Sequence, residues 1–143
     1  EPAPAAFSEE VIAAESVRLN EWFETKFNEA VARDPMRQTY LGIKDRYGEW
    51  SDASEAFELA ELEIQRAEIA EMKASFDFNK LDHQTQLSWR LAEYQLERAE
   101  ASWPYRGHSY VFNQMFGVQS GIPAFLINQH KVTSASDAEA YIS

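Results

Sequence analysis

Apolar side chains recur at the spacing of an α-helix along most of the chain, and this periodicity limits the folds it can adopt. The clearest stretch is residues 8–33, where one helical stripe would carry Ile12, Leu19, Phe23, Phe27 and Ala30. Only 5 Gly and 5 Pro interrupt the 143 residues, which is too few for the frequent turns of a β-sandwich or barrel. The sequence therefore predicts an all-α fold, an irregular helical array of about four main helices plus short ones.

Capping residues place the ends of the longer helices. These helices are predicted at residues 8–33, 52–76 and 82–103, and shorter ones at 35–42, at 122–129 and from 136 onward. Ser8 and Asp82 are predicted N-terminal caps, because a short polar side chain can accept from the free N–H groups of the first turn. Asp52 followed by Glu55 has the form of a capping box, which predicts the start of the helix at 52–76.

The shorter helices carry similar signals. Pro35 is expected in the first turn of one of them and Gly42 at its C-terminal cap. Pro123 is expected to start the helix at 122–129, and Ser136 with Glu139 forms a second capping box.

The sequence stops just after that second capping box, which predicts that the chain is truncated at its C-terminus. Residues 1–7 are then interpreted as a flexible tether left after a signal segment was removed. Residues 8–143 are interpreted as the helical N-terminal portion of a larger domain.

The helices at 52–76 and 82–103 differ in how many apolar stripes they carry. The first has one stripe, with inward residues predicted to be Phe57, Ala60, Ile64, Ala67 and Met72. The second has a stripe of Leu87, Leu91 and Tyr94 and, on nearly the opposite side, a stripe of Trp89, Leu96 and Trp103. Because a helix that is apolar on two sides needs two neighbours, the helix at 82–103 is predicted to lie centrally.

Charge and composition exclude several classes of function. The 13 basic and 24 acidic residues give a net charge of −11, which disfavours binding to nucleic acid. There is no Cys, so the chain has no disulfide, no thiolate zinc site and no Cys nucleophile. No apolar run approaches the ~20 residues that a transmembrane helix needs.

The histidines do not form a recognisable metal motif. His83, His108 and His130 each lack a second His one helical turn away, which a helical zinc motif requires. His83 is predicted to lie at the surface. No cofactor is therefore expected in this chain, and no residue is assigned a catalytic or metal-binding role.

One weakly charged segment stands out as a candidate cleft lining. Charges are absent between His108 and His130, and the segment mixes aromatic residues, glycines and amides. The candidate lining residues are His108, Tyr110, Asn113, Gln114, Gln119 and His130. The alternative interpretation is a buried loop whose amides satisfy one another, and the sequence leaves both open.

The same region carries a resemblance to a known family. Residues 106–115, 117–120, 123–130 and 136–141, together with 16–23, 35–42 and 89–100, resemble the bacterial domain of unknown function 885 family. The resemblance covers nearly the whole chain after the tether. It implies a longer, mostly helical protein that is often exported and lipid-anchored and that is similar to zinc metallopeptidases of the thermostable carboxypeptidase type.

The resemblance also implies a function. The zinc motif of the family lies downstream, so zinc is expected in the full-length parent, and this chain is expected to wall or cover the substrate cleft. The expected partners are the missing C-terminal part of the parent and a peptide substrate, with self-association of the fragment and with membrane contact only through a lost N-terminal lipid anchor. The expected location is the periplasm or cell envelope, as an exported lipoprotein. The alternative is a stand-alone helical binding module of the envelope without catalytic activity.

Overall fold

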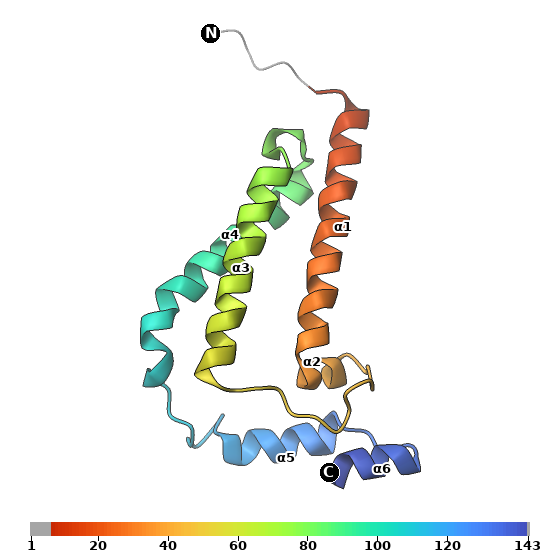
Figure 1. Ribbon diagram of the computed structural model, residues 1–143, viewed down its shortest axis with the longest axis vertical. Coiled ribbons are helices and arrows are strands. Elements are labelled where there is room, and N and C mark those ends of the chain that lie inside the picture. The colour runs from red at the N-terminus through yellow and green to blue at the C-terminus, as the bar shows by residue number, and fades with distance from the viewer. Residues whose placement is uncertain (1–6, 143) are drawn as a thin grey trace. The chain divides into compact units, whose positions relative to one another are not determined.

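The computed structural model describes residues 7–142, while residues 1–6 and 143 lie outside the described part. Within residues 7–142 the chain forms helices and turns but no strand, so the predicted all-α class is confirmed (Figure 1). The predicted tether at residues 1–7 lies almost wholly outside the described residues and stays a prediction. The chain divides into two compact units, which are described separately.

Unit 1 contains residues 7–27 and Ser54–Pro104, and unit 2 contains Asn28–Ala53 and residues 105–142. The α-helices are α1 (Glu9–Arg33), α2 (Pro35–Tyr40), α3 (Glu55–Ser75), α4 (His83–Ser102), α5 (Val118–Asn128) and α6 (Ala135–Ile142). Two 3₁₀ segments, η1 (Phe78–Lys80) and η2 (Trp103–His108), flank α4.

The N-terminal caps of α1 and α4 are those predicted. Ser8 Oγ accepts from the Val11 N–H at 3.4 Å, and Asp82 Oδ1 accepts from the Thr85 N–H at 2.7 Å. The predicted cap of α3 at Asp52 is wrong, because the N-terminal cap is Ser54, whose Oγ accepts from the Phe57 N–H at 3.2 Å. Ser54 stands directly before the helix in extended backbone, so its hydroxyl is the group within reach of the free N–H groups.

The short helix α2 ends at Tyr40 with Leu41 as its cap, and the glycine predicted to terminate it, Gly42, follows directly. The Gly42 N–H donates to the Thr39 carbonyl at 3.0 Å, and the Ile43 N–H donates to the Gln38 carbonyl at 2.9 Å. This pair of bonds is the Schellman motif, which requires a residue with positive φ, and Gly42 has φ of 78°. This helix ending therefore depends on the absence of a Cβ atom at position 42.

Two predicted helix starts in unit 2 are wrong. The helix α5 begins at Val118 and holds Pro123 inside it, because the Gly117 carbonyl already accepts from the N–H groups of Ser120 and Gly121. Because Pro123 has no backbone N–H, the helix lacks one backbone hydrogen bond at this position. The helix α6 begins at Ala135, before the predicted box.

The core of unit 1 joins its three long helices. Leu19 of α1, Met72 of α3 and Trp89 of α4 are buried together with Leu81, the residue that follows η1. The predicted inward stripe of α3 is correct at Met72 but wrong at Ala60 and Ala67, which are exposed. Leu62 is buried in their place, so the buried stripe of α3 is shifted around the helix.

The prediction that α4 is covered on two sides is wrong for the described residues. Trp89 is buried and Leu96 and Trp103 are half-buried, whereas the opposite stripe is open. Leu87, Leu91 and Tyr94 keep 53%, 52% and 54% of their surface exposed. Periodicity places these apolar residues on one side of the helix, but it does not say whether another element covers that side.

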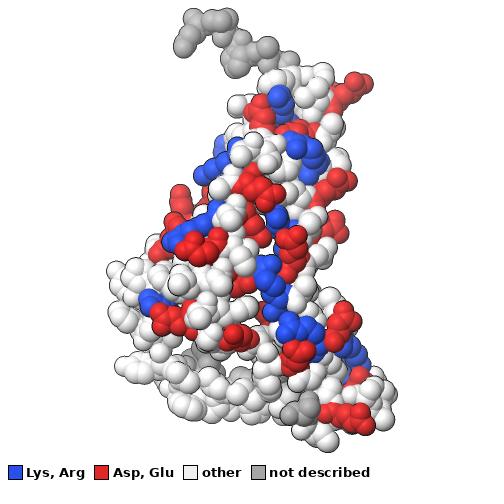
Figure 2. All heavy atoms as spheres, viewed as in Figure 1, with Lys and Arg blue, Asp and Glu red and all other residues white. Residues whose placement is uncertain are grey.

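On the face seen in Figure 2, acidic and basic side chains are spread along the helices of unit 1. Arg66 of α3 lies 2.7 Å from Glu63 and 2.7 Å from Glu100 of α4, and Lys73 lies 2.8 Å from Glu93. Ion pairs exposed to this degree contribute little stability each, so the buried apolar cluster holds the three helices together. None of the helices in residues 7–142 is both long enough and apolar enough to span a membrane.

Candidate functional site

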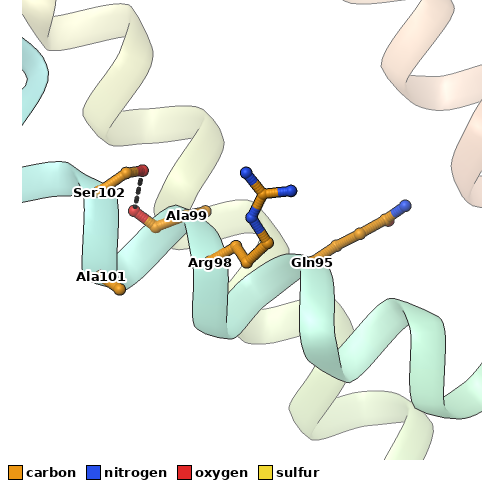
Figure 3. Close-up of a pocket in the computed structure, with 5 residues that line it drawn as sticks. All are labelled: Gln95, Arg98, Ala99, Ala101 and Ser102. Atoms are coloured by element: carbon orange, nitrogen blue, oxygen red, sulfur yellow. Dashed lines mark hydrogen bonds between the residues drawn. The ribbon is translucent and has the colours of Figure 1, made fainter.

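Each unit has a depression or cavity at its surface, and the two differ in volume. In unit 1 an open depression of about 480 Å³ lies on α4, lined by Gln95, Arg98 and three small residues (Figure 3). In unit 2 a small cavity of about 30 Å³ lies beside His130 and Tyr141. The second volume suits a water molecule rather than a substrate, so neither feature is by itself an active site.

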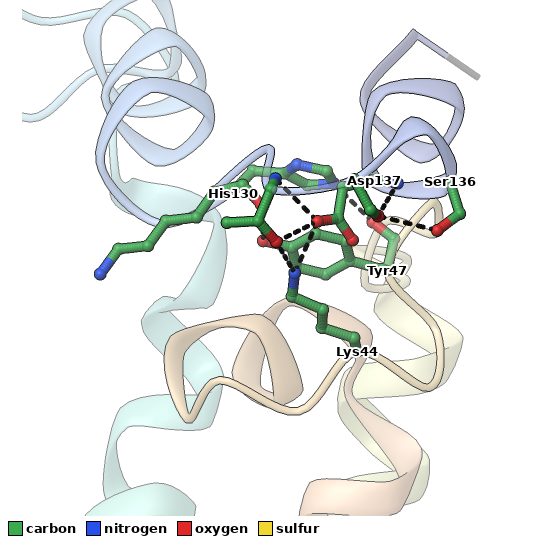
Figure 4. A network of polar contacts seen from close by, with 8 residues as sticks. Lys44, Tyr47, His130, Ser136 and Asp137 are labelled. Carbon is green, nitrogen blue, oxygen red and sulfur yellow. Dashed lines mark hydrogen bonds and ion pairs between the residues drawn. The ribbon is translucent and has the colours of Figure 1, made fainter.

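A polar network centred on Asp137 joins α6 to the loop after α2 (Figure 4). Lys44 Nζ lies 2.7 Å from Asp137 Oδ2, and the same oxygen accepts from the Thr133 N–H at 2.8 Å and from Thr133 Oγ1 at 2.6 Å. The hydrogen bond from Lys44, followed by those from the Thr133 side chain and backbone, holds the pKa of Asp137 well below its ordinary value. Asp137 is therefore a fixed, ionised anchor rather than a group that exchanges protons near neutral pH.

His130 is the most buried candidate residue, with 5% of its surface exposed. Its Nε2 lies 2.8 Å from the Tyr47 carbonyl oxygen. Since a carbonyl oxygen can only accept, Nε2 carries the proton in this hydrogen bond. The ring stacks on Tyr47 with centroids 3.8 Å apart and meets Tyr141 edge-on at 5.3 Å. Its Nδ1 has no hydrogen-bond partner among residues 7–142.

The loop before α5 satisfies its own polar groups. Asn113 Oδ1 accepts from the N–H groups of Met115 and Phe116 at 2.9 and 2.6 Å, and Gln119 Nε2 donates to the Asn113 carbonyl. A Cβ atom added at Gly117 would lie only 2.5 Å from the Asn113 backbone nitrogen, so this close approach needs glycine.

The predicted site residues therefore fall into different settings. Asn113 and Gln119 lie together, Gln114 and Tyr110 are exposed, and His108 lies in η2 with its ring 5.6 Å from Tyr105. Among the described residues no hydrogen bond or ring contact joins His108 to His130.

The alternative interpretation of this segment is right that Asn113 and Gln119 bond within the loop, but the burial it expected is wrong, because the aromatic side chains face solvent. Tyr110 and Phe116 are each 85% exposed, and no Asp, Glu, Lys or Arg occurs in residues 107–130. We call the exposed apolar residues of this segment the uncharged surface: Tyr110, Val111, Phe112, Met115, Phe116, Val118, Ile122 and Ile127. In Figure 2 the region of α5 is almost free of acidic and basic side chains. An exposed apolar surface is thus present in the described part of the chain.

Sequence reasoning missed the partners of His130 and Asp137. Tyr47 and Lys44 lie in a loop without periodicity, so nothing in their surroundings marks them. Asp137 lies between Ser136 and Glu139 of the predicted capping box, and the sequence assigned it no role of its own. In the structure Ser134 Oγ accepts from the Asp137 N–H at 3.2 Å, so the cap is Ser134 and the carboxylate turns back to Thr133. Within residues 7–142 no group of three or more His, Asp or Glu side chains is arranged to hold a metal ion.

These features define an all-helical protein with an uncharged exposed surface. The family described as bacterial protein of unknown function (DUF885) matches residues 35–143, which is most of the chain. The chain belongs to this family, and the resemblance predicted from its sequence is confirmed. No curated protein and no solved structure matches it.

Proposed function

We propose that this chain is the non-catalytic helical portion of a larger, exported, zinc-peptidase-like protein, in which it walls or covers the substrate cleft. The uncharged surface of unit 2 is the observation that carries the proposal. Phe112 is 70% exposed and Tyr110 and Phe116 are 85% exposed, although each could bury a large apolar area. Monomeric proteins seldom leave such a surface uncovered unless a ligand or another chain segment uses it.

The chemistry of this surface suits an extended peptide. The side chains of a peptide would pack on the aromatic rings, and its amide groups would find donors and acceptors at the exposed Gln114 side chain and the Tyr110 hydroxyl. Asn113 and Gln119 would act indirectly, because their hydrogen bonds to the loop already fix its conformation.

Zinc, if the larger protein uses it, is proposed to be held by residues outside this chain. His130 is buried with Nε2 engaged, and His83 and His108 are exposed without neighbouring ligands, so the described residues do not fit the metal. We assign no step of metal-assisted hydrolysis to any residue of this chain. Its contribution would be the shape and apolar character of the cleft.

The cellular setting follows the same proposal. The protein would be exported and attached to the cell envelope by a lipid at the N-terminus, and the net charge of −11 argues against a nucleic-acid partner. Its remaining partner would be the rest of its own polypeptide.

The test uses the longer protein that carries this chain, assayed for hydrolysis of a peptide mixture. Phe112→Gln and Phe116→Gln should raise KM about ten-fold with kcat little changed, because they remove binding that is equal in the ground and transition states. Leu59→Gln is the control, since Leu59 is also a partly exposed apolar residue but lies on α3 in unit 1. Zinc content should be the same in all the proteins. Unchanged KM in both Phe variants would refute the cleft-wall proposal.

The alternative is a stand-alone binding module, which the same exposed surface would also serve. In that case the isolated chain would bind a peptide or protein partner through Phe112 and Phe116, and the longer protein would hydrolyse no peptide. This result would refute the cleft-wall proposal and support the stand-alone binding module.

A further inference from the structure

A second exposed apolar surface lies on α4 in unit 1 and does not depend on the function proposed above. Leu87, Leu91 and Tyr94 are each about half exposed and stand at positions i, i+4 and i+7 of the helix. Residues at this spacing form one continuous row along a helix. We call these three residues the α4 row.

The surface beside the α4 row is hollowed. A depression of about 270 Å³ lies between α1 and α4, with Phe23 of α1 and Leu91, Ala92 and Gln95 of α4 among its lining residues. Gln95 also lines the depression of about 480 Å³ that contains Arg98. Since Gln95 is common to both, the two depressions adjoin along α4. Their lining mixes apolar and small side chains with polar ones such as Asn20, Ser88 and Gln95.

The charge at the end of the row is unmatched. Arg98 stands one turn beyond Tyr94 and projects from α4 beside Gln95 (Figure 3). Its guanidinium carbon lies 5.9 Å from the centre of the Tyr94 ring, and no carboxylate in residues 7–142 forms an ion pair with it. In the same unit Arg66 and Lys73 both pair with acidic residues of α4. An unpaired Arg is notable in a chain with 24 acidic and 13 basic residues.

We propose that the α4 row and Arg98 together bind an amphipathic helix of a protein partner that carries an acidic residue. Apolar side chains at i, i+4 and i+7 of that helix would interlock with Leu87, Leu91 and Tyr94, as ridges pack into grooves between helices. An Asp or Glu one turn from the end of the partner's apolar residues would meet Arg98, whose guanidinium can hold a carboxylate through two parallel hydrogen bonds. The groove against Phe23 would accept the flank of the partner helix.

A second copy of the same surface does not meet this requirement. The residues before the α4 row on its own side of the helix are His83 and Gln84, and the row itself has no carboxylate. Two α4 rows placed face to face would therefore bring apolar residues together but leave Arg98 without an acid. The partner is thus a helix of different sequence.

The binding test uses two synthetic amphipathic peptides of about 18 residues, a length that can form a helix on docking. Both peptides carry Leu at i, i+4 and i+7. One has Glu one turn before and one turn after the leucines, and the other has Lys at those two positions. The chain should bind the Glu peptide at least ten-fold more tightly than the Lys peptide in fluorescence anisotropy.

Charge reversal makes the test specific. Arg98→Glu should weaken binding of the Glu peptide about ten-fold, equivalent to about 1.4 kcal/mol, and strengthen binding of the Lys peptide. Leu91→Gln should weaken both. Arg90→Glu is the control because Arg90 is an Arg of the same helix that lies over the Phe78 ring instead. Circular dichroism should show that all variants keep the helical content of the original chain.

Two results would overturn the inference. One is equal affinity of the original chain for both peptides, or no binding of either peptide. The other is a dimer in sedimentation analysis that Leu91→Gln dissociates, which would make a second copy of the chain the occupant of the α4 row.

Discussion

His130 and Tyr47 meet through two contacts at once, although 83 positions separate them in the sequence. The Nε2 of His130 donates to the Tyr47 carbonyl oxygen at 2.8 Å, and the two rings stack with centroids 3.8 Å apart. The first contact fixes the ring nitrogen that carries the proton, and the second excludes water from the ring face. The pair connects the end of α5 to the loop after α2, so we interpret it as a structural clasp of unit 2.

Replacement of His130 tests this clasp. His130→Ala should lower the free energy of unfolding of the chain by about 2 kcal/mol or more, because it opens a cavity and leaves the Tyr47 carbonyl without its donor. His108→Ala is the matched control, since His108 is exposed, and its effect should stay within about 0.5 kcal/mol. Urea denaturation of both variants measures the difference. Equal midpoints would show that the clasp does not stabilise unit 2.

The Lys44–Asp137 contact predicts a pH dependence of stability. The folded state lowers the pKa of Asp137 below 3.8, so the carboxylate stabilises the fold above that pH, and the contribution is lost as pH falls toward the folded pKa. Asp137→Asn should therefore lower the thermal midpoint at pH 7, and the gap from the original chain should shrink as pH is lowered below about 4. Thr133 donates to the carboxylate in both a backbone and a side-chain hydrogen bond, so Thr133→Val should reproduce part of the loss. A gap that stays constant from pH 7 to pH 3 would contradict this account.

Much of the helical fold could be predicted because its signals are local. Asp82 caps α4 and Pro35 begins α2 through groups that lie within a few residues in the sequence. The same local reasoning failed where two nearby residues could both act as the N-terminal cap of a helix. Asp52 and Ser54 are each capable of capping α3, and only the path of the chain decides between them. Pro123 is tolerated inside α5 because Gly117 already starts that helix, which the proline rule alone does not reveal.

The candidate site could be predicted far less completely, because its contacts join distant parts of the sequence. Lys44 and Asp137 stand 93 positions apart, and no spacing rule connects them. The segment around Phe112 was recognised as unusual from its lack of charge, yet its exposure depends on whether another surface covers it. Composition marks such residues, while only the packed chain shows which of them remain open.

The different backbone conformations of Gly42 and Gly121 predict that replacement by Ala changes stability in opposite directions at the two positions. Gly42→Ala should destabilise the chain by about 1 kcal/mol, because φ of 78° is unfavourable for a residue with a Cβ even where no atom is near. Gly121→Ala should instead raise stability by about 0.5–1 kcal/mol, since Gly121 lies inside α5 and the added methyl group would also meet no atom. Thermal denaturation of the two variants gives the sign of each effect. Loss of stability in Gly121→Ala as well would contradict this account, because the backbone conformation would then not decide the sign.

The one-sided packing of α4 predicts a contrast between its two apolar stripes. Trp89→Ala should cost about 3–5 kcal/mol, because Trp89 is buried in the core with Leu19 and Met72 and meets the Phe78 ring at 5.7 Å. Leu87→Ala should cost less than about 0.5 kcal/mol in the chain alone, since half of its side chain already faces solvent. Chemical denaturation measures both values. A large loss for Leu87→Ala would mean that both stripes are covered, as the sequence first indicated.

The separate settings of the histidines lead to a final prediction about zinc. The isolated chain should not bind zinc with micromolar or better affinity, because a tight site needs three or four ligands held at fixed distances. His130 is buried with Nε2 donating to Tyr47, while His83 and His108 are exposed and belong to no group of three acidic or His side chains in residues 7–142. Titration calorimetry with zinc chloride should therefore show only weak heats, unchanged by His108→Ala. One-to-one binding in the micromolar range that this variant abolishes would place a metal site in unit 2 and would reverse the assignment of zinc to another part of the larger protein.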